Sequence, residues 1–250
     1  MKKISIKNIF SYNPKKTTQR EIEDSVVAKS YSSGHNDDLF TEIVSQIEGK
    51  DVIDLGCGDG AFGRVLKSRR KDLKLTGLDF LIDKNSNFLF YDNIIEDNFI
   101  NYNFSNYDTI ISNHFFEHLY IQEIISLLEK MRGKKVIISV PFEHNTLCYV
   151  KHFLSAADQV DNIKNYKYLI GAMHKTTFDS KLISYLGFKK IKTNTGSQIL
   201  VKEREINDKD KYQAQLYIIS LQEKIIYKVF NNLFFVLLKP VRFIKNRLLP

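Results

Sequence analysis

The chain has 250 residues, of which 43% are hydrophobic and 26% charged, and its formal net charge is +8. These values are ordinary for a globular protein, and the length suits one α/β domain with short attachments. The two cysteines, Cys57 and Cys148, give neither a disulfide framework nor the spacing of a zinc site. This composition excludes a disulfide-stapled secreted domain and favours a reducing compartment.

The positive charge lies at the two ends of the chain. Residues 1–20 and residues 224–250 each carry six Lys or Arg and no acidic residue, which leaves 25 basic and 29 acidic residues between them. An enzyme that acts on nucleic acid normally has its positive charge beside the active site, so we expect no nucleic-acid partner. Basic ends favour contact with an anionic surface such as a membrane, and solvated flexible ends are the alternative.

Three segments are expected from the pattern of composition. Residues 1–36 are polar and basic and form an N-terminal arm, residues 37–203 form the main domain, and residues 204–250 form an amphipathic, basic C-terminal tail. The first residues lack the apolar core of a signal peptide, and no stretch of about twenty apolar residues is free of charge. The sequence therefore predicts a cytoplasmic protein, at most peripheral to the inner face of the membrane.

Short apolar runs alternate with helical periodicity through the first part of the domain. We expect a helix from Asp37 that ends at Gly49, and then further helices over residues 61–68 and 121–131. Strands are expected at residues 51–55, 74–79, 88–91, 107–112 and 135–140. Short apolar strands joined by helices predict a parallel sheet that is covered on both faces.

The second part of the domain begins after Pro141. Residues 145–175 form a long insert rich in aromatic residues and lysine, which is either an acceptor-site insert or a solvent-exposed lid with core-facing aromatics. A helix over residues 179–186 ends at Gly187, and strands over 188–191 and 197–201 follow. This last pair is expected to be antiparallel and to close the sheet.

A glycine-rich segment lies between the first predicted strand and the helix that follows it. It reads Asp54-Leu55-Gly56-Cys57-Gly58-Asp59-Gly60. Gly56 and Gly58 allow a tight turn and the close approach of a ligand to the backbone, and the N-terminus of the helix faces that ligand. Asp79 ends the next strand, where its carboxylate can accept hydrogen bonds from both hydroxyls of a ribose.

The segment resembles the first motif of class I S-adenosylmethionine-dependent methyltransferases, acidic-x-Gly-x-Gly-x-Gly. It departs from the dinucleotide fingerprint because its third glycine comes one residue early. S-adenosylmethionine has no phosphate but carries an ammonium group, which suits an acidic residue such as Asp54. A nicotinamide cofactor, or a glycine-rich turn without a ligand, is the alternative.

Later segments are similar to the quinone-biosynthesis and biotin-pathway methyltransferases of this class. They are residues 107–119, Val140-Pro141, His174-x-x-x-Phe178 and Gly187-Phe188. The resemblance implies an α/β, Rossmann-like fold with a seven-stranded, mostly parallel sheet, an antiparallel last strand and helices on both faces.

The resemblance also implies a set of cofactor-binding residues. They are Asp54, Gly56, Cys57, Gly58, Gly60, Asp79, Phe80, Asp92 and Asn113. Asp92, which follows Phe90-Tyr91, is expected to accept a hydrogen bond from the amino group of adenine. Cys57 is expected to serve as a small packing residue of the loop and not as a nucleophile.

Methyl transfer to oxygen or nitrogen requires alignment and a base that removes a proton. His114 follows the fourth strand at its carboxyl end, where ligands of open α/β sheets bind, and His144 follows the fifth strand. These two are our candidate catalytic residues, whereas His118 is better suited to packing. No metal is expected, because the paired carboxylates of the metal-dependent O-methyltransferases are not apparent and Asp108 lies at the start of its strand.

The sequence thus predicts transfer of a methyl group from S-adenosylmethionine to an oxygen of a small molecule or glycan, including a lipid- or nucleotide-linked saccharide. Nitrogen and carbon acceptors stay open. The alternatives are a noncatalytic S-adenosylmethionine-binding subunit of a larger complex and a nicotinamide-dependent oxidoreductase. The apolar, lysine-bearing tail over residues 225–238 could lie on an anionic membrane, pair two copies as a homodimer, or pack on its own core.

Overall fold

The computed structural model describes residues 37–80, 82, 88–141, 176–193 and 197–221. The predictions for the N-terminal arm, for the insert at 145–175 with His144 and His174, and for the tail beyond residue 221 lie outside the described residues.

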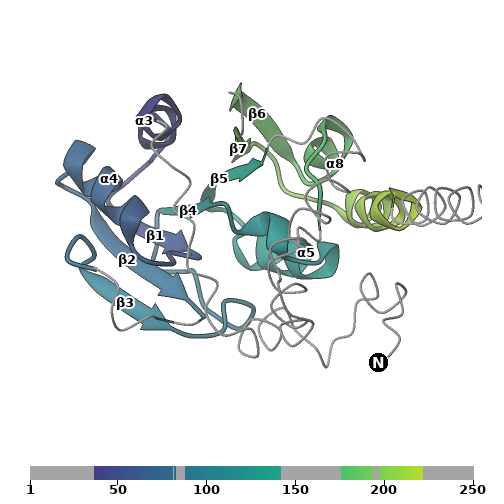
Figure 1. Cartoon of the computed structure of the whole chain (residues 1–250). Coiled ribbons are helices and arrows are strands. Elements are labelled where there is room, and N and C mark those ends of the chain that lie inside the picture. The colour runs from purple at the N-terminus through teal and green to yellow at the C-terminus, as the bar shows by residue number, and fades with distance from the viewer. Residues whose placement is uncertain (1–36, 81, 83–87, 142–175, 194–196, 222–250) are drawn as a thin grey trace, which may run out of the picture.

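Seven strands form one sheet in the order β3-β2-β1-β4-β5-β7-β6 (Figure 1). They are β1 Asp51–Leu55, β2 Lys74–Asp79, β3 Asn93–Glu96, β4 Thr109–Asn113, β5 Lys135–Pro141, β6 Phe188–Thr193 and β7 Ser197–Lys202. Strands β1 to β5 pair in parallel, whereas β7 is antiparallel to both β5 and β6. The predicted fold class is confirmed.

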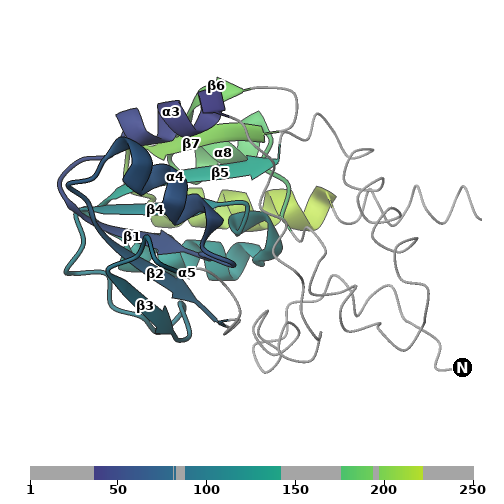
Figure 2. The ribbon, with the colours of Figure 1, turned by 60° about the vertical axis from the view of Figure 1, so that its left-hand side comes forward.

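Helices cover both faces of the sheet (Figures 1 and 2). On one face lie α3 Asp37–Ser45 and α4 Ala61–Arg69, and on the other lie α5 Ile121–Lys130, α8 Ser180–Tyr185 and a helix over residues 208–221. Side chains of a strand alternate between faces, so Val52 joins the core cluster under α3 and α4 while Ile53 joins the cluster under α5 and α8.

The helix over residues 208–221 belongs to the folded unit. Its Ala214 and Ile218 are 0% and 4% exposed within the core cluster of α5 and α8. The Tyr217 hydroxyl donates a hydrogen bond to Asp179, whose other carboxylate oxygen caps α8 by accepting from two backbone N–H groups. The helix over residues 208–221 thus packs on the core of α5 and α8, and the domain boundary at residue 203 stays a prediction.

The strand predicted at residues 88–91 is wrong. Residues 89 and 90 form a turn, and β3 begins at Asn93. The Tyr91 ring instead fills space that two glycines leave open, because a Cβ at Gly63 would lie 2.2 Å from it and one at Gly77 would lie 3.0 Å from it. Tyr91 is thus buried between elements, whereas Leu89 of the same apolar run is 86% exposed.

Candidate cofactor and catalytic site

Three loops meet at the carboxyl edge of the sheet. They follow β1, β2 and β4, and β1 lies between the other two strands. Because the chain crosses from β1 to β2 on one side and later returns to β4 on the other, this edge is the switch point where open α/β sheets bind ligands. It brings together the glycine loop, Asp79 and the Asn113-His114 pair.

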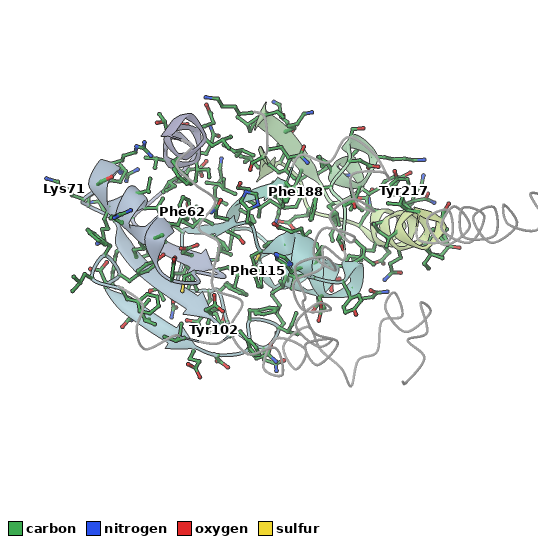
Figure 3. All side chains as sticks on the ribbon, in the orientation of Figure 1. Phe62, Lys71, Tyr102, Phe115, Phe188 and Tyr217 are labelled. Atoms are coloured by element: carbon green, nitrogen blue, oxygen red, sulfur yellow. The ribbon has the colours of Figure 1, made fainter. Side chains whose placement is uncertain are left out.

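The glycine loop has a backbone that other residues adopt only with strain. Gly56, Gly58 and Gly60 have φ angles of 77°, 55° and 81°, all in the left-handed region. A Cβ on Gly56 would also lie 2.6 Å from the ring of Phe115, which follows β4 (Figure 3). The loop therefore needs glycine both for its turn and for the close approach of a neighbouring ring.

Asp79 holds the glycine loop against the end of β2. One carboxylate oxygen accepts a hydrogen bond from the Gly58 N–H at 2.8 Å, and the other accepts from the Phe80 N–H at 2.7 Å. Phe80 itself is 6% exposed and belongs to the core. The structure thus brings together Gly58, Asp79 and Phe80 of the predicted cofactor set.

Asp54 is buried beside this loop, with only 1% of its surface exposed. Its Oδ2 accepts a hydrogen bond from the Tyr91 hydroxyl at 2.5 Å, whereas its Oδ1 has no hydrogen-bond partner among the described residues. Burial raises the pKa of Asp54 to about 7, the Tyr91 hydrogen bond opposes this shift, and the charge of Asp79 adds to it. A cation at Oδ1 would satisfy this oxygen and favour the ionised form.

Cys57 is 5% exposed and lies in the core on the α4 side. Burial, together with the negative charges of Asp54 and Asp79, raises the pKa of its thiol. A thiol held in its neutral form is a poor nucleophile, which agrees with a packing role for Cys57.

His114 occupies a strained position at the end of β4, where Asn113 is the last residue. Its φ angle is 53°, a value that costs a non-glycine residue about 1–2 kcal/mol. Its backbone N–H donates to the Ser139 carbonyl oxygen at 2.8 Å. Its ring nitrogens are both engaged, since Nδ1 lies 3.2 Å from Glu117 Oε1 and Nε2 lies 2.8 Å from Ser197 Oγ.

The Glu117 carboxylate is 2% exposed and the His114 side chain is 20% exposed. A buried carboxylate at one ring nitrogen fixes the orientation of an imidazole and stabilises its protonated form. Sequence reasoning selected His114 but missed Glu117 and Ser197 as its partners. The three-residue spacing from His114 to Glu117 was a local signal, whereas Ser197 is 83 positions away.

Asp92 lies at the opposite edge of the sheet. Its carboxylate accepts from Lys67 Nζ and from the Leu75 N–H, each at 2.7 Å, next to the start of β2. Burial alone would raise the pKa of Asp92, but these two hydrogen bonds outweigh it and the pKa is lowered. Asp92 therefore forms an ion pair with Lys67 near the start of β2, and its contact with adenine stays a prediction.

The observed position of β3 brings another acidic residue to the carboxyl edge. The residue that follows β3 at the carboxyl edge is Asp97, whose N–H donates to the Asp79 carbonyl oxygen at 3.1 Å and whose side chain is exposed. The sequence analysis did not select Asp97 as a site candidate. Several acidic residues flank the short edge strand β3, so its two apolar residues, Ile94 and Ile95, were not recognised as a strand.

Asp108 is also remote from the site, since its carboxylate accepts from the N–H groups of Lys50 and Asp51 at the amino edge. Within the described ranges, no group of three or more His, Cys, Asp or Glu side chains could hold a metal ion. None of the helices in these parts of the chain has the length and apolar character needed to cross a bilayer.

The sheet order, the glycine loop and the acidic residue at the end of β2 define a class I, Rossmann-like S-adenosylmethionine-binding fold. A family model described as a methyltransferase domain matches residues 30–163, more than half of the chain, and the chain belongs to this family. It is an S-adenosylmethionine-dependent methyltransferase, which excludes the nicotinamide alternative. No curated protein matches its sequence.

Solved structures of similar fold include other methyltransferases. The plantazolicin methyltransferase BpumL with S-adenosylhomocysteine is 15% identical, with a TM-score of 0.44 and 74% of this chain and 96% of that chain covered. Human N-acetylserotonin methyltransferase with S-adenosylmethionine is 13% identical, with a TM-score of 0.43 and coverage of 67% and 52%. An O-methyltransferase family protein from Burkholderia thailandensis is 14% identical, with a TM-score of 0.46 and coverage of 69% and 56%.

Proposed function

We propose that this methyltransferase acts on a hydroxyl oxygen of a small molecule or glycan, with His114 as the base. The observation that carries the proposal is the Glu117–His114 pair at the carboxyl edge of β4. The next residue, Phe115, contacts the glycine loop at Gly56, so the imidazole belongs to the same edge as the cofactor residues. A base is needed for a hydroxyl acceptor because the oxygen must lose its proton as it forms the new bond.

Three carboxylates are proposed to hold the cofactor. Asp79 would accept from the ribose hydroxyls, Asp54 from the ammonium group through its buried Oδ1, and Asp97 from the amino group of adenine. Three carboxylates, which accept hydrogen bonds and carry negative charge, fit a ligand that has an ammonium group and no phosphate. When bound, S-adenosylmethionine supplies a methyl group activated by its sulfonium.

The acceptor class rests on the sequence. The aromatic and lysine-rich insert and the basic tail favour a saccharide, including a lipid- or nucleotide-linked one. His144 lies outside the described residues and stays a second candidate base.

We also propose that the helix over residues 208–221 contacts an anionic membrane. Tyr212, Leu216 and Ile219 are 58%, 43% and 47% exposed and recur at the i, i+4, i+7 spacing of one helix face. The sequence beyond residue 221 continues with apolar residues and six Lys or Arg. Burial of this face in a bilayer interface would remove apolar surface from water. Pairing of two copies through it is the alternative outcome.

His114→Ala tests the proposed base. We expect its turnover to fall about 100-fold, because a general base contributes 10²–10⁴ to the rate, while its affinity for S-adenosylhomocysteine changes less than twofold. His118→Ala is the matched control, since it removes the other histidine of the same segment, and we expect turnover within threefold of the unmodified protein. The assay uses labelled S-adenosylmethionine with a panel of phenols, monosaccharides and nucleotide sugars.

Equal turnover of the two variants would refute the role of His114. If the unmodified protein binds S-adenosylhomocysteine but methylates none of these phenols, monosaccharides and nucleotide sugars, the proposed hydroxyl acceptor class is wrong.

A further inference from the structure

Ser197 completes a hydrogen-bonded chain that joins β4 to β7. Its hydroxyl lies 2.8 Å from His114 Nε2, while Glu117 lies at the other ring nitrogen. Both end members are buried, with Ser197 at 9% and Glu117 at 2% exposed. The ring of His114 is thus fixed at two points by residues from different elements.

The two outer residues of this hydrogen-bonded set, Ser197 and Glu117, lie next to further hydrogen bonds of the fold. At the Ser197 end, the neighbouring Gln198 is 1% exposed and its side chain donates to the carbonyl oxygens of Phe178 at 2.6 Å and Pro141 at 3.3 Å. At the Glu117 end, the backbone carbonyl oxygen accepts from the Thr176 N–H at 3.1 Å. Such anchoring reduces the freedom of the three side chains and preorganises them.

The hydrogen-bond roles follow from the chemistry of the groups. We take Glu117 as a carboxylate; because a carboxylate only accepts, His114 then carries its proton on Nδ1. Nε2 is then an acceptor, and the Ser197 hydroxyl donates to it. Among the described residues, His114 is the hydrogen-bond partner of Ser197 Oγ, so the lone pairs of this oxygen can accept from an acceptor hydroxyl at the edge of the sheet where β7 begins opposite Pro141.

We propose that Ser197 passes the proton of the acceptor hydroxyl to His114 and that Glu117 positions the imidazole; this inference rests on the proposed O-methylation. As the acceptor oxygen takes the methyl group, its proton moves to Ser197 Oγ and the proton of Ser197 moves to His114 Nε2. Serine is restored as a neutral hydroxyl. The resulting imidazolium is stabilised by Glu117 and later releases its proton to solvent.

Two substitutions at Ser197 test the relay. We expect Ser197→Ala to lower kcat about 100-fold with S-adenosylhomocysteine affinity within twofold, because only the proton route is removed. Ser197→Thr keeps the hydroxyl and should recover kcat to within about tenfold of the unmodified protein. Ser112→Ala is the matched control, since Ser112 is 2% exposed on β4 and its hydroxyl has no hydrogen-bond partner in the described parts of the chain.

Glu117→Gln tests the positioning role by two readouts that a merely structural role would not move. Nitrogen NMR of the unmodified protein should show the His114 proton on Nδ1, and the variant should lose this preference. The kcat of the variant should fall about 100-fold while KM stays within twofold, because the imidazole loses its orientation and not its contact with the acceptor.

The outcomes separate the relay from the proposed function. If the enzyme makes an O-methylated product but Ser197→Ala is as active as Ser112→Ala, or if the proton of His114 lies on Nε2, the relay is refuted and O-methylation stands. If the labelled methyl group is recovered only on carbon, the proposed O-methylation fails and the proton route fails with it.

Discussion

Replacing Asp54 by asparagine removes a carboxyl group whose pKa burial raises to about 7. Asparagine keeps the size of the side chain and an oxygen for the Tyr91 hydroxyl. The substitution therefore separates the charge of residue 54 from its packing. Because the proposed partner of Asp54 Oδ1 is an ammonium group, the charge should matter most when the cofactor binds.

The expected pH dependence follows from linkage. An ammonium group prefers the carboxylate, so binding below pH 7 must release the proton that Asp54 holds in the free protein. With a pKa of about 7, the ionised fraction falls about 25-fold between pH 7.5 and pH 5.5, which corresponds to a loss of about 2 kcal/mol of binding free energy. The affinity of Asp54→Asn should be weaker at pH 7.5 and nearly constant over this range.

The same shift predicts how stability depends on pH without cofactor. The ordinary pKa of 3.8 is raised to about 7 in the folded protein, so the folded state binds the proton more tightly than the unfolded chain. Stability is therefore highest below pH 4 on account of this group, decreases as the pH rises, and levels off above pH 7. The full effect is about 4 kcal/mol, and Asp54→Asn should not show it.

Isothermal titration with S-adenosylhomocysteine between pH 5.5 and 7.5, in buffers of different ionisation enthalpy, measures both the affinity and the proton release. Urea denaturation over pH 4.5–8 gives the stability difference between the two proteins. If both proteins lose affinity equally on acidification, and no proton is released by the unmodified protein, then Asp54 does not contact the ammonium group.

Three further predictions concern the cofactor loops and the tail. Asp97→Ala should weaken S-adenosylhomocysteine binding by about 1–2 kcal/mol, whereas Asp92→Ala should leave it unchanged; the reverse result would support Asp92 as the residue that contacts adenine. Gly56→Ala should abolish the binding of S-adenosylhomocysteine. Its control is Gly133→Ala: Gly133 also has a positive φ, of 74°, but a Cβ there would have nothing within 4 Å, so this variant should bind the ligand and lose only about 1–2 kcal/mol of stability. Equal binding by the two variants would refute the packing argument. Truncation after residue 221 should keep binding in calorimetry but weaken co-sedimentation with anionic vesicles, because it removes six Lys or Arg and leaves the exposed face of Tyr212, Leu216 and Ile219 in place; loss of a dimer instead would assign the tail to pairing.

The sequence alone determined the features that depend on neighbouring residues. The left-handed turns of the glycine loop require glycine at Gly56 and Gly58 whatever surrounds them. The capping of α8 by Asp179 and the end of that helix at Gly187 are local in the same sense. The alternation of short apolar strands and amphipathic helices, repeated along the chain, was sufficient to predict the parallel sheet and its antiparallel closing pair.

Only the tertiary structure decided the features that join distant parts of the chain. An apolar residue can be buried by a strand or by a turn, so the position of β3 depended on Tyr91 filling the space beside Gly63 and Gly77. The pairing of His114 with Ser197, 83 residues away, follows from the placement of β7 against β5. The periodicity of a segment shows which of its residues are buried but not which other segment covers them. Contacts between distant segments are selected by the free energy of packing and hydrogen bonding in the folded protein.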